Sequence, residues 1–589
     1  MTAKRIYLAW LEHRLRQFLR DARRTREIQR GVLLQKLARN AESDFGRLHG
    51  FSSIRSVDDF RRQVPISTFE TLSPHLSQVL NGRTQALFGP GTQVLMFAMT
   101  SGTTGEPKRL PMTAESFREY KAGWRLWGAG AFKDHQDLLR KKTLQLSSDW
   151  RQFASPSGIP CGQISGLAAT TRPWIAANMF TPPPATIQIH DWAAKHYTTL
   201  RIALAEREIG MIMTANPSTL VELAGRIHQN TELLLRDIHD GTLSCELSPE
   251  ARSGLQPWVA RRDPARAREL ERLANKQGGL SPKLAWPEMS LLSVWTGGSA
   301  GFFVSQLEKW YGELPTRDHG LSASEGRMTI PLSDNDPAGV LEFNHHFFEF
   351  VPVEGHGRPD ANVLEAHELE AGADYYILLT TSGGLYRYDI HDVVRCTGFV
   401  GAAPLLQFLN KGKNFCNLTG EKLSEFQVVS AVEAAFKELG LPVGACLVAP
   451  LIEAWPGYVL LVERHQYSGL RAELEASVQS NLERLNEEYA SKCASGRLLP
   501  LKVREVPNGT WLKMRDARIR VRGNVEEYKH AFLAQDPALV ERLTSSDGAI
   551  RPAKVSPSIS ENAPAAPHMR PSRDGNLAVS NSGAILPNQ

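Results

Sequence analysis

A loop of small residues at Thr100–Lys108 is the first stretch of this sequence whose composition indicates chemistry. It reads TSGTTGEPK and follows the apolar run VLMFAM (94–99), which predicts a strand. Backbone N–H groups of such a loop can form a nest for an anion, and a lysine adds a compact positive charge. The spacing excludes a Walker loop, because the second glycine stands three residues before the lysine and no hydroxyl residue follows it. The loop therefore indicates phosphate binding of another kind, with a plain Gly/Ser turn as the alternative.

The pattern [ST]-[ST]-G-[ST]-[ST]-G-x-P-K resembles the phosphate loop of the acyl-adenylate-forming superfamily, whose members join a carboxylate to AMP. The resemblance implies a catalytic charge on Lys108. It implies ATP binding by Ser101, Gly102, Thr103, Thr104 and Gly105.

A second stretch, DHGLSASEGRMTIP (318–331), is similar to the Thr/Ser–Glu element of the same superfamily. The similarity implies that Glu325 is a catalytic residue that binds Mg²⁺ together with ATP, and that Ser324 lies near the α-phosphate of ATP. A carboxylate plus phosphate oxygens is a ligand set that Mg²⁺ accepts. The tyrosine that stacks on adenine in the superfamily is Leu321 here. Adenine would then lie on an aliphatic surface, or on an aromatic side chain from elsewhere.

A third stretch, TTSGGLYRYDIHDVVRCTGF (380–399), narrows the resemblance. An aspartate beside a turn between strands can accept two strong hydrogen bonds from ribose hydroxyls. The stretch resembles the Gretchen Hagen (auxin-responsive promoter) family of acyl acid amido synthetases, and the match implies that Asp392 is the ribose ligand and that Arg387 contributes to ATP binding. The family has glycine where this chain has His391, and Asp389 is an alternative ribose ligand.

Three other stretches extend this likeness to residues 25–535. FFEFVP (347–352) is similar to a strand of the family, and LTGEKLSEFQ is similar to the segment that leads into its small domain. There, Lys422 is implied as a catalytic, ATP-contacting lysine. Tyr528 and Lys529 match the aromatic–lysine pair near the end of the family, although the next residue, His530, departs from the family pattern. The match implies that Lys529 is a catalytic lysine.

The resemblance implies an ATP- and Mg²⁺-dependent ligase that acts in two steps. A small carboxylic acid would be activated as acyl-AMP with release of pyrophosphate, and an amino acid or another amine would then take the acyl group. Two alternatives stay open. One is an acyl-CoA or acyl-carrier ligase with the same first step, and the other is a non-catalytic adenylate-fold protein that binds a partner.

The elements that must position these residues alternate between strand and helix. The apolar runs SVWTGG (293–298) and YYILLTT (375–381) predict buried strands that enter turns. A helix over 424–440, strands within 445–463, a helix over 470–492, a strand over 499–506 and a helical stretch over 524–543 are expected after them. The expected class is α/β with the acyl-adenylate-forming fold, a large multi-sheet N-terminal domain and a smaller, mobile C-terminal α/β domain.

The organisation expected from composition has five parts. They are a basic amphipathic helix (1–25), the large domain (26–410), a hinge (411–425), the small domain (426–543) and a disordered tail (544–589). Leu8, Leu11, Leu15 and Phe18 recur at helical spacing in the first part. That face would dock on the protein, or alternatively on a membrane surface or a partner.

Composition limits the function classes further. The net charge of +5 is small for 589 residues, which argues against a nucleic-acid binder. No stretch is apolar and long enough for a membrane span, and the charged start does not resemble a secretory signal. The six cysteines are scattered without CxxC spacing, which indicates a cytoplasmic protein without a zinc site. The oligomeric state is not indicated.

Overall fold

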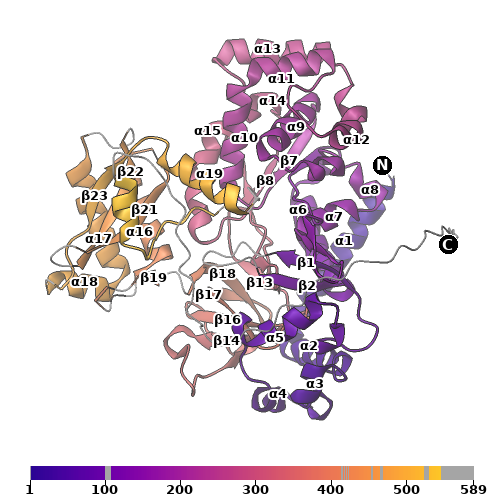
Figure 1. Ribbon diagram of the computed structural model, residues 1–589, viewed down its shortest axis with the longest axis vertical. Helices are drawn as coiled ribbons and strands as arrows, with labels where there is room; N and C mark the ends of the chain where they lie inside the picture. The colour runs from indigo at the N-terminus through magenta and orange to yellow at the C-terminus, as the bar shows by residue number, and fades with distance from the viewer. Residues whose placement is uncertain are drawn as a thin grey trace, which may run out of the picture. The chain divides into compact units, whose positions relative to one another are not determined.

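The computed structural model of the chain describes residues 2–99, 108–412, 415–416, 418–419, 421, 423–442, 444–452, 456–464, 469–495, 497–522 and 529–544. Lys422, residues 101–105, Tyr528 and the expected tail beyond residue 544 lie outside these ranges. Helices and strands alternate through the described chain and form several sheets (Figure 1).

Helix α1 (Thr2–Asp21) lies along helix α6 (Ala114–Asp134). The side chains of Leu11, Leu15 and Phe18 are buried, whereas the arginines of α1 are on exposed or partly exposed faces. The apolar spacing of this helix therefore serves packing against the rest of the protein. The next helices along the chain are α2 (Thr25–Arg39), α3 (Asp44–Leu48), α4 (Val57–Gln63) and α5 (Phe69–Leu80).

A seven-stranded sheet has the order β12-β13-β18-β17-β16-β14-β15. Its strands are β12 (Thr329–Ile330), β13 (Gly339–Leu341), β14 (Phe347–Pro352), β15 (Leu364–Glu365), β16 (Asp374–Thr380), β17 (Tyr388–Val400) and β18 (Ala403–Lys411). The long strands β14, β16, β17 and β18 lie side by side in Figure 1 and pair antiparallel in the order β14-β16-β17-β18. The strands expected at 347–352 and 375–381 are confirmed, the second with a shift of one residue. Their residues are nearly all buried, which explains the continuous apolar runs.

In a four-stranded sheet with the order β2-β1-β5-β4, strands β1 and β2 stand before and after the small-residue loop in the sequence. Strand β1 (Val94–Met99) runs antiparallel to β2 (Arg109–Thr113), and Met99 is the register partner of Arg109. The chain therefore leaves and re-enters this sheet at neighbouring points on either side of residues 100–108. The other strands are β4 (Phe153–Ala154) and β5 (Pro160–Gly162).

A parallel five-stranded sheet has the order β6-β3-β7-β8-β9. Its strands are β3 (Lys142–Gln145), β6 (Phe180–Thr181), β7 (Ile209–Met213), β8 (Leu291–Ser293) and β9 (Thr316–Arg317). The longer helices around it are α9 (Trp192–Ala205), α10 (Pro217–Gln229), α11 (Thr231–Asp240), α12 (Pro249–Val259) and α13 (Pro264–Gln277). The strand expected over 293–298 is wrong, because β8 ends at Ser293 and a 3-10 helix begins at Gly298, whose φ of +55° suits glycine.

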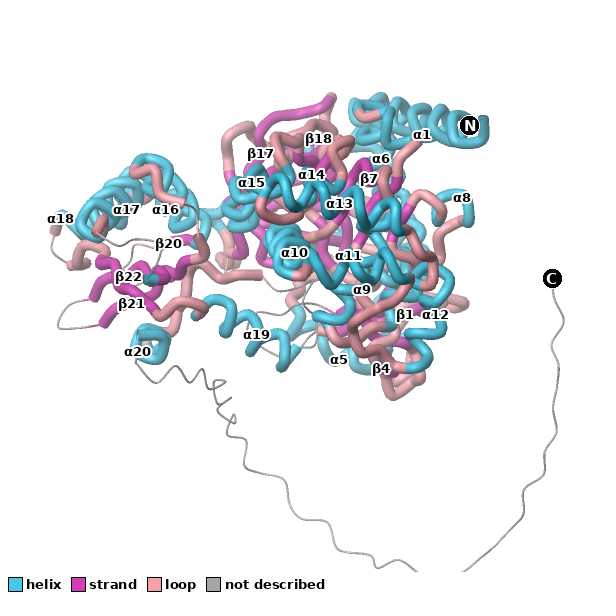
Figure 2. The backbone as a smooth tube through the Cα atoms, turned by 90° about the horizontal axis from the view of Figure 1, so that it is seen from above, coloured by secondary structure: helices cyan, strands magenta, loops and turns pink. Residues whose placement is uncertain are grey.

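A three-stranded sheet near the C-terminus contains β21 (Cys446–Ile452), β22 (Pro456–Glu463) and β23 (Lys502–Val506). Figure 2 shows α16 (Glu425–Glu438) and α17 (Arg471–Leu485) on one face of it and α20 (Ala538–Thr544) on the other. Successive side chains of β21 point to opposite faces of the sheet, which explains why both faces are packed against helices. Val448 belongs to the core cluster with α16 and α17, whereas Leu447 packs in a second cluster with Val540 and Leu543 of α20.

Two of the expected helices near the C-terminus differ from the structure. The helix expected over 470–492 is divided at Asn486, whose side chain caps α18 (Glu487–Ala494). The helix expected over 524–543 is wrong for residues 529–537, because the backbone there forms a bridge with β21: Val448 N–H donates to the Phe532 carbonyl, and Ala534 N–H donates to the Val448 carbonyl, each at 2.8 Å. Before this segment, α19 spans Thr510–Arg522. None of the helices in the described ranges combines the length and apolar composition needed to cross a bilayer.

Candidate active site

Glu325 lies at a tight turn that contacts the end of strand β1. The turn joins β10 (Ser322–Ala323) to β11 (Gly326–Arg327), which pair antiparallel. The Ser324 hydroxyl donates a 3.2 Å hydrogen bond to the carbonyl of Met99, the last residue of β1. The turn with Ser324 and Glu325 is therefore adjacent in the folded chain to Met99, the residue that precedes the small-residue loop in the sequence.

The environment of the Glu325 carboxyl group suits a cation. Burial raises its pKa, the positive charge of Lys411 opposes that rise, and the nearby carboxylate of Asp392 adds to it. A carboxylate that is poorly solvated and close to a second carboxylate favours binding of a positive ion. The structure thus fits the Mg²⁺ ligand implied for this residue, because a poorly solvated oxygen donor lies close to a second carboxylate, that of Asp392.

Asp392, the implied ribose ligand, forms an ion pair across two strands. Asp392 in β17 is the register partner of Lys411 in β18, and the Lys411 ammonium contacts the Asp392 carboxylate. Asp392 is almost fully buried, whereas 43% of the Lys411 side chain is exposed. Burial lowers the pKa of Lys411, but the carboxylates of Asp392 and Glu325 outweigh it and raise the pKa overall. Lys411 was missed by the sequence reasoning.

Lys108 approaches the same group of residues from the other side of the loop. Its Nζ lies 3.4 Å from the hydroxyl of Tyr388 and 4.7 Å from the ring centroid of Phe69 in α5. Tyr388 is the first residue of β17, and burial raises the pKa of its hydroxyl, with the charges of Glu325 and Asp392 adding to the rise. We name Lys108, Glu325, Tyr388, Asp392 and Lys411 the charged cluster.

Arg387 is held within the protein core beside this cluster. Its Nε donates to Glu349 at 2.9 Å, and its Nη1 donates to the carbonyls of Val64 at 2.9 Å and Arg61 at 3.2 Å. Its φ is +45°, which is uncommon for a residue with a side chain. These contacts join the N-terminal helices to β14, and the ATP-binding role of Arg387 stays a prediction.

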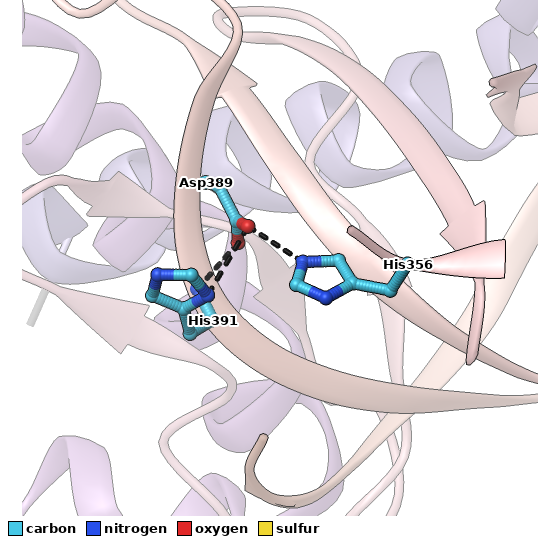
Figure 3. Close-up of side chains that lie close together, drawn as sticks. All are labelled: His356, Asp389 and His391. Carbon is cyan, nitrogen blue, oxygen red and sulfur yellow. Dashed lines mark hydrogen bonds and ion pairs between the residues drawn. The ribbon is translucent and has the colours of Figure 1, made fainter. Parts of the chain in front are cut away.

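Asp389, the alternative ribose ligand, is surrounded by two histidines (Figure 3). Its Oδ2 lies 2.7 Å from Nε2 of His356 and 3.1 Å from Nδ1 of His391, and its Oδ1 accepts from the His391 N–H at 2.7 Å. Burial raises the pKa of Asp389, but the hydrogen bonds from the two imidazoles outweigh it, so the pKa is held well below its usual range. The three side chains are also a group with metal-ligating chemistry, since one ligand atom of each lies within 4.8 Å of the others.

His391 has a backbone conformation that favours glycine, since its φ is +58°. We expect His391→Ala to be less stable than His391→Gly by about 1 kcal/mol, because both lose the imidazole but only alanine keeps a Cβ in the left-handed region. Urea unfolding of the two variants would measure this difference. Equal stabilities would contradict the conformation.

Only some of the other residues predicted from the sequence lie in the part of the chain that the structure describes. Lys422 and residues 101–105 lie outside the described ranges, and so does Tyr528. Lys529 is exposed, and its Nζ lies 5.8 Å from the ring centroid of Trp295, just after β8. Leu321, at the position of the superfamily tyrosine, is 5% exposed and belongs to the main core cluster. It therefore offers little surface to adenine, which favours an aromatic side chain from elsewhere.

A cavity opens beside Glu325. The turn with Ser324, Glu325 and Arg327 lines one part of it, and Ser116 and Tyr120 of α6 line another. Its other walls come from Pro111 and Met112 of β2, Ile164, Ala323, Gly326, His346 and Gly383. Its walls combine apolar and charged groups, and its volume of about 20 Å³ leaves room for about one water molecule.

Comparisons with known proteins extend over nearly the whole chain. The model of the GH3 family N-terminal domain matches residues 14–316, that of the central domain matches 339–411, and that of the C-terminal domain matches 426–538. The probable indole-3-acetic acid-amido synthetase GH3.4 of Oryza sativa subsp. japonica is 27% identical over 587 residues, which cover 93% of this chain and 92% of that protein. The indole-3-acetic acid-amido synthetase GH3.3 of Arabidopsis thaliana is 25% identical over 570 residues, which cover 93% of this chain and 94% of that protein.

A solved structure has the same fold. The GH3.15 acyl acid amido synthetase superposes with a TM-score of 0.79 at 21% identity, and the match covers 90% of this chain and 96% of that chain. The expected α/β adenylate-forming fold is thereby confirmed. With all three domain models matched in order along the sequence, this chain is a member of the GH3 family.

Proposed function

We propose that this protein is an ATP-dependent acyl acid amido synthetase. It activates a small carboxylic acid as acyl-AMP, releases pyrophosphate, and transfers the acyl group to an amino acid or another amine. The observation that carries the proposal is the charged cluster, in which Lys108, Glu325 and the Asp392–Lys411 pair come together from four separate segments. The names of its relatives, which are indole-3-acetic acid-amido synthetases, support the same reaction class.

The first step is chiefly a problem of charge. A carboxylate must approach a triphosphate, and negative charge develops on the α-phosphoryl oxygens. Lys108 and Lys411 offset that charge, and Asp392 orients the ribose. Mg²⁺ bound at Glu325 would supply further charge neutralisation at the phosphates. Each preorganised group of this kind contributes about 3–4 kcal/mol in comparable sites.

In the second step, the residues around the acyl carbon must rearrange so that the amine can attack it. We propose that the small domain (426–543) moves about the hinge (411–425) relative to the large domain (26–410). Lys422 and Lys529 would then reach the nucleotide in one orientation and withdraw in the other. Closure would also keep water away from acyl-AMP.

The six cysteines are all free, which supports a reducing, cytoplasmic location.

The test of this function is pyrophosphate exchange followed by product analysis. The purified full chain should exchange labelled pyrophosphate into ATP only when a suitable carboxylic acid and Mg²⁺ are present. Addition of an amino acid should then give an amide and AMP. Consumption of the adenylate by CoA but by no amine would support the acyl-CoA ligase instead, and no exchange with any acid of a broad panel would support the non-catalytic alternative.

A further inference from the structure

Asp389, His356 and His391 form a compact group of metal-ligating side chains at the start of β17. Both imidazole rings point to the carboxylate of Asp389 (Figure 3). Nε2 of His356 and Nδ1 of His391 lie 2.7 and 3.1 Å from the same oxygen, Oδ2, and the three atoms all lie within 4.8 Å of one another. Two imidazole nitrogens and one carboxylate oxygen are a donor set that zinc accepts.

The distances within the group suit a small ion with tetrahedral coordination. Zinc lies about 2.0–2.1 Å from an imidazole nitrogen and about 2.0–2.2 Å from a carboxylate oxygen, so two of its ligand atoms are about 3.3 Å apart. The two nitrogens would therefore move away from Oδ2 by about 0.2–0.6 Å to admit the ion. The side chains of His356 and His391 are 24% and 19% exposed, whereas Asp389 is buried. Solvent thus reaches the group, and a water molecule can take the fourth position.

Neighbouring groups already orient two of the three side chains. The His356 ring stacks on the ring of Tyr376, with centroids 3.6 Å apart and planes 15° apart. The backbone N–H of His391 donates to Oδ1 of Asp389 at 2.7 Å, so that Oδ2 is the oxygen that faces the imidazoles. Contacts of this kind orient the ligands of metal sites and add to the affinity for the ion.

The backbone of His391 is a second observation that points to a ligand. Its φ of +58° lies in the left-handed region that favours glycine. Residues with a side chain keep such a conformation where the surrounding structure compensates for the strain, and they gather at binding sites. Glycine would relieve the strain and would keep the backbone hydrogen bond to Asp389. What histidine adds at this position is the imidazole nitrogen beside Oδ2, where His356 already supplies another.

We propose that His356, Asp389 and His391 bind a zinc ion that has a structural role. The ion joins the loop at His356 to strand β17. It is separate from the Mg²⁺ proposed at Glu325, because Mg²⁺ prefers oxygen ligands and the new site supplies two nitrogens. The inference does not depend on the proposed function.

Hydrogen bonds connect this site to the chain that leaves β18. The N–H of Gly412 donates to the His391 carbonyl at 2.7 Å, and the Tyr376 hydroxyl donates to the Gly412 carbonyl at 3.5 Å. Asp392, the proposed ribose ligand, follows His391 directly in β17. An ion on His356, Asp389 and His391 therefore steadies the strand that carries Asp392, and it occupies Asp389, which leaves Asp392 as the carboxylate for the ribose.

The experiment titrates the full-length protein with Zn²⁺ after metal has been removed with a chelator. Calorimetry should show that wild type binds one Zn²⁺ at least about tenfold more tightly than His391→Gly does. This variant removes the imidazole and relieves the backbone strain, so that misfolding does not account for the loss. His356→Gln and Asp389→Asn should show the same loss. An excess of Mg²⁺ should not displace the ion from wild type.

Thermal unfolding and spectroscopy provide further measurements. Zn²⁺ should raise the melting temperature of wild type but not that of His391→Gly. Co²⁺ in place of Zn²⁺ should give wild type the visible absorption of a tetrahedral ion, which His391→Gly should lack. His239→Gln is the matched control and should behave like wild type, because His239 is an exposed histidine 2.8 Å from Asp240 that belongs to no three-ligand group among the described residues.

Two results would overturn the proposal. One is wild type that binds Zn²⁺ no more tightly than His391→Gly, and the other is a His239→Gln variant that loses as much affinity as His391→Gly. The three side chains would then be a hydrogen-bonded group only, with Zn²⁺ bound at other sites. Neither result bears on the proposed function, because pyrophosphate exchange is assayed with Mg²⁺ alone. Equally, a protein that exchanges with no acid would leave the Zn²⁺ titration unaffected.

Discussion

Glu325→Gln is expected to lower the rate of acid-dependent pyrophosphate exchange about 10²- to 10³-fold, the range observed when one preorganised charge-stabilising group is removed from an active site. Glutamine keeps the shape of the side chain but loses the negative charge that would hold Mg²⁺ beside the phosphates. Exchange assays over a range of Mg²⁺ concentrations would measure both the rate and the shift of the metal dependence to higher concentration.

The exposed Glu354→Gln is the matched control and should exchange like wild type. A Glu325→Gln variant that retains exchange within threefold of wild type would contradict the assignment of the metal ligand.

Glu325→Gln should also change how the melting temperature of the protein depends on pH. The pKa of Glu325 is raised in the folded protein, chiefly by burial. The folded state therefore binds this proton more tightly than the unfolded state, and its stabilising effect is present at low pH and is lost as pH rises through the folded pKa. Without metal and nucleotide, Glu325→Gln should match wild type near pH 4 and melt higher than wild type at pH 7.5. A lower melting temperature at pH 7.5 would contradict this reading.

Sequence patterns predicted the parts of the fold that depend on local burial. The apolar runs of β14 and β16 are continuous because both faces of these strands are buried, and they were placed to within one residue. The run at 293–298 looks similar but contains two glycines, and the chain turns into a 3-10 helix there. The segment 529–537 has residues that suit a helix, yet its backbone bonds to β21, which is about 80 residues away in the sequence. That tertiary contact overrides local preference.

For the site as for the fold, some residues could be predicted from a local motif, whereas others depend on contacts between distant segments. Glu325 and Ser324 were predicted from the motif alone, and the structure places the Ser324 hydroxyl within hydrogen-bond distance of Met99 at the end of β1. Lys411 became apparent only from the structure, because its importance depends on the pairing of β17 with β18, which places it opposite Asp392.

Lys411→Met is expected to destabilise the protein by about 2 kcal/mol at pH 7.5. Removing one partner of a buried ion pair costs about 3–5 kcal/mol. The smaller value is expected here because 43% of the Lys411 side chain is exposed, so that water already screens part of the interaction. The variant leaves Asp392 and Glu325 as two poorly solvated carboxylates without the cation that they share. Urea unfolding would measure the loss, and Lys411→Arg should retain most of the stability.

The double variant Asp392→Asn with Lys411→Met separates the ion pair from simple packing. If the loss comes from a stranded carboxylate, neutralising Asp392 should restore more than half of the stability lost by Lys411→Met, which is a coupling that independent sites would not give. The loss should also shrink at pH 5, since Glu325, whose pKa is raised by burial, can then take up a proton. Pyrophosphate exchange should not recover in the double variant, because the proposed ribose ligand is still missing. A double variant no more stable than Lys411→Met would show that Lys411 stabilises the strand pair by packing alone. The charged cluster would then lack its electrostatic link between Asp392 and the Glu325 site.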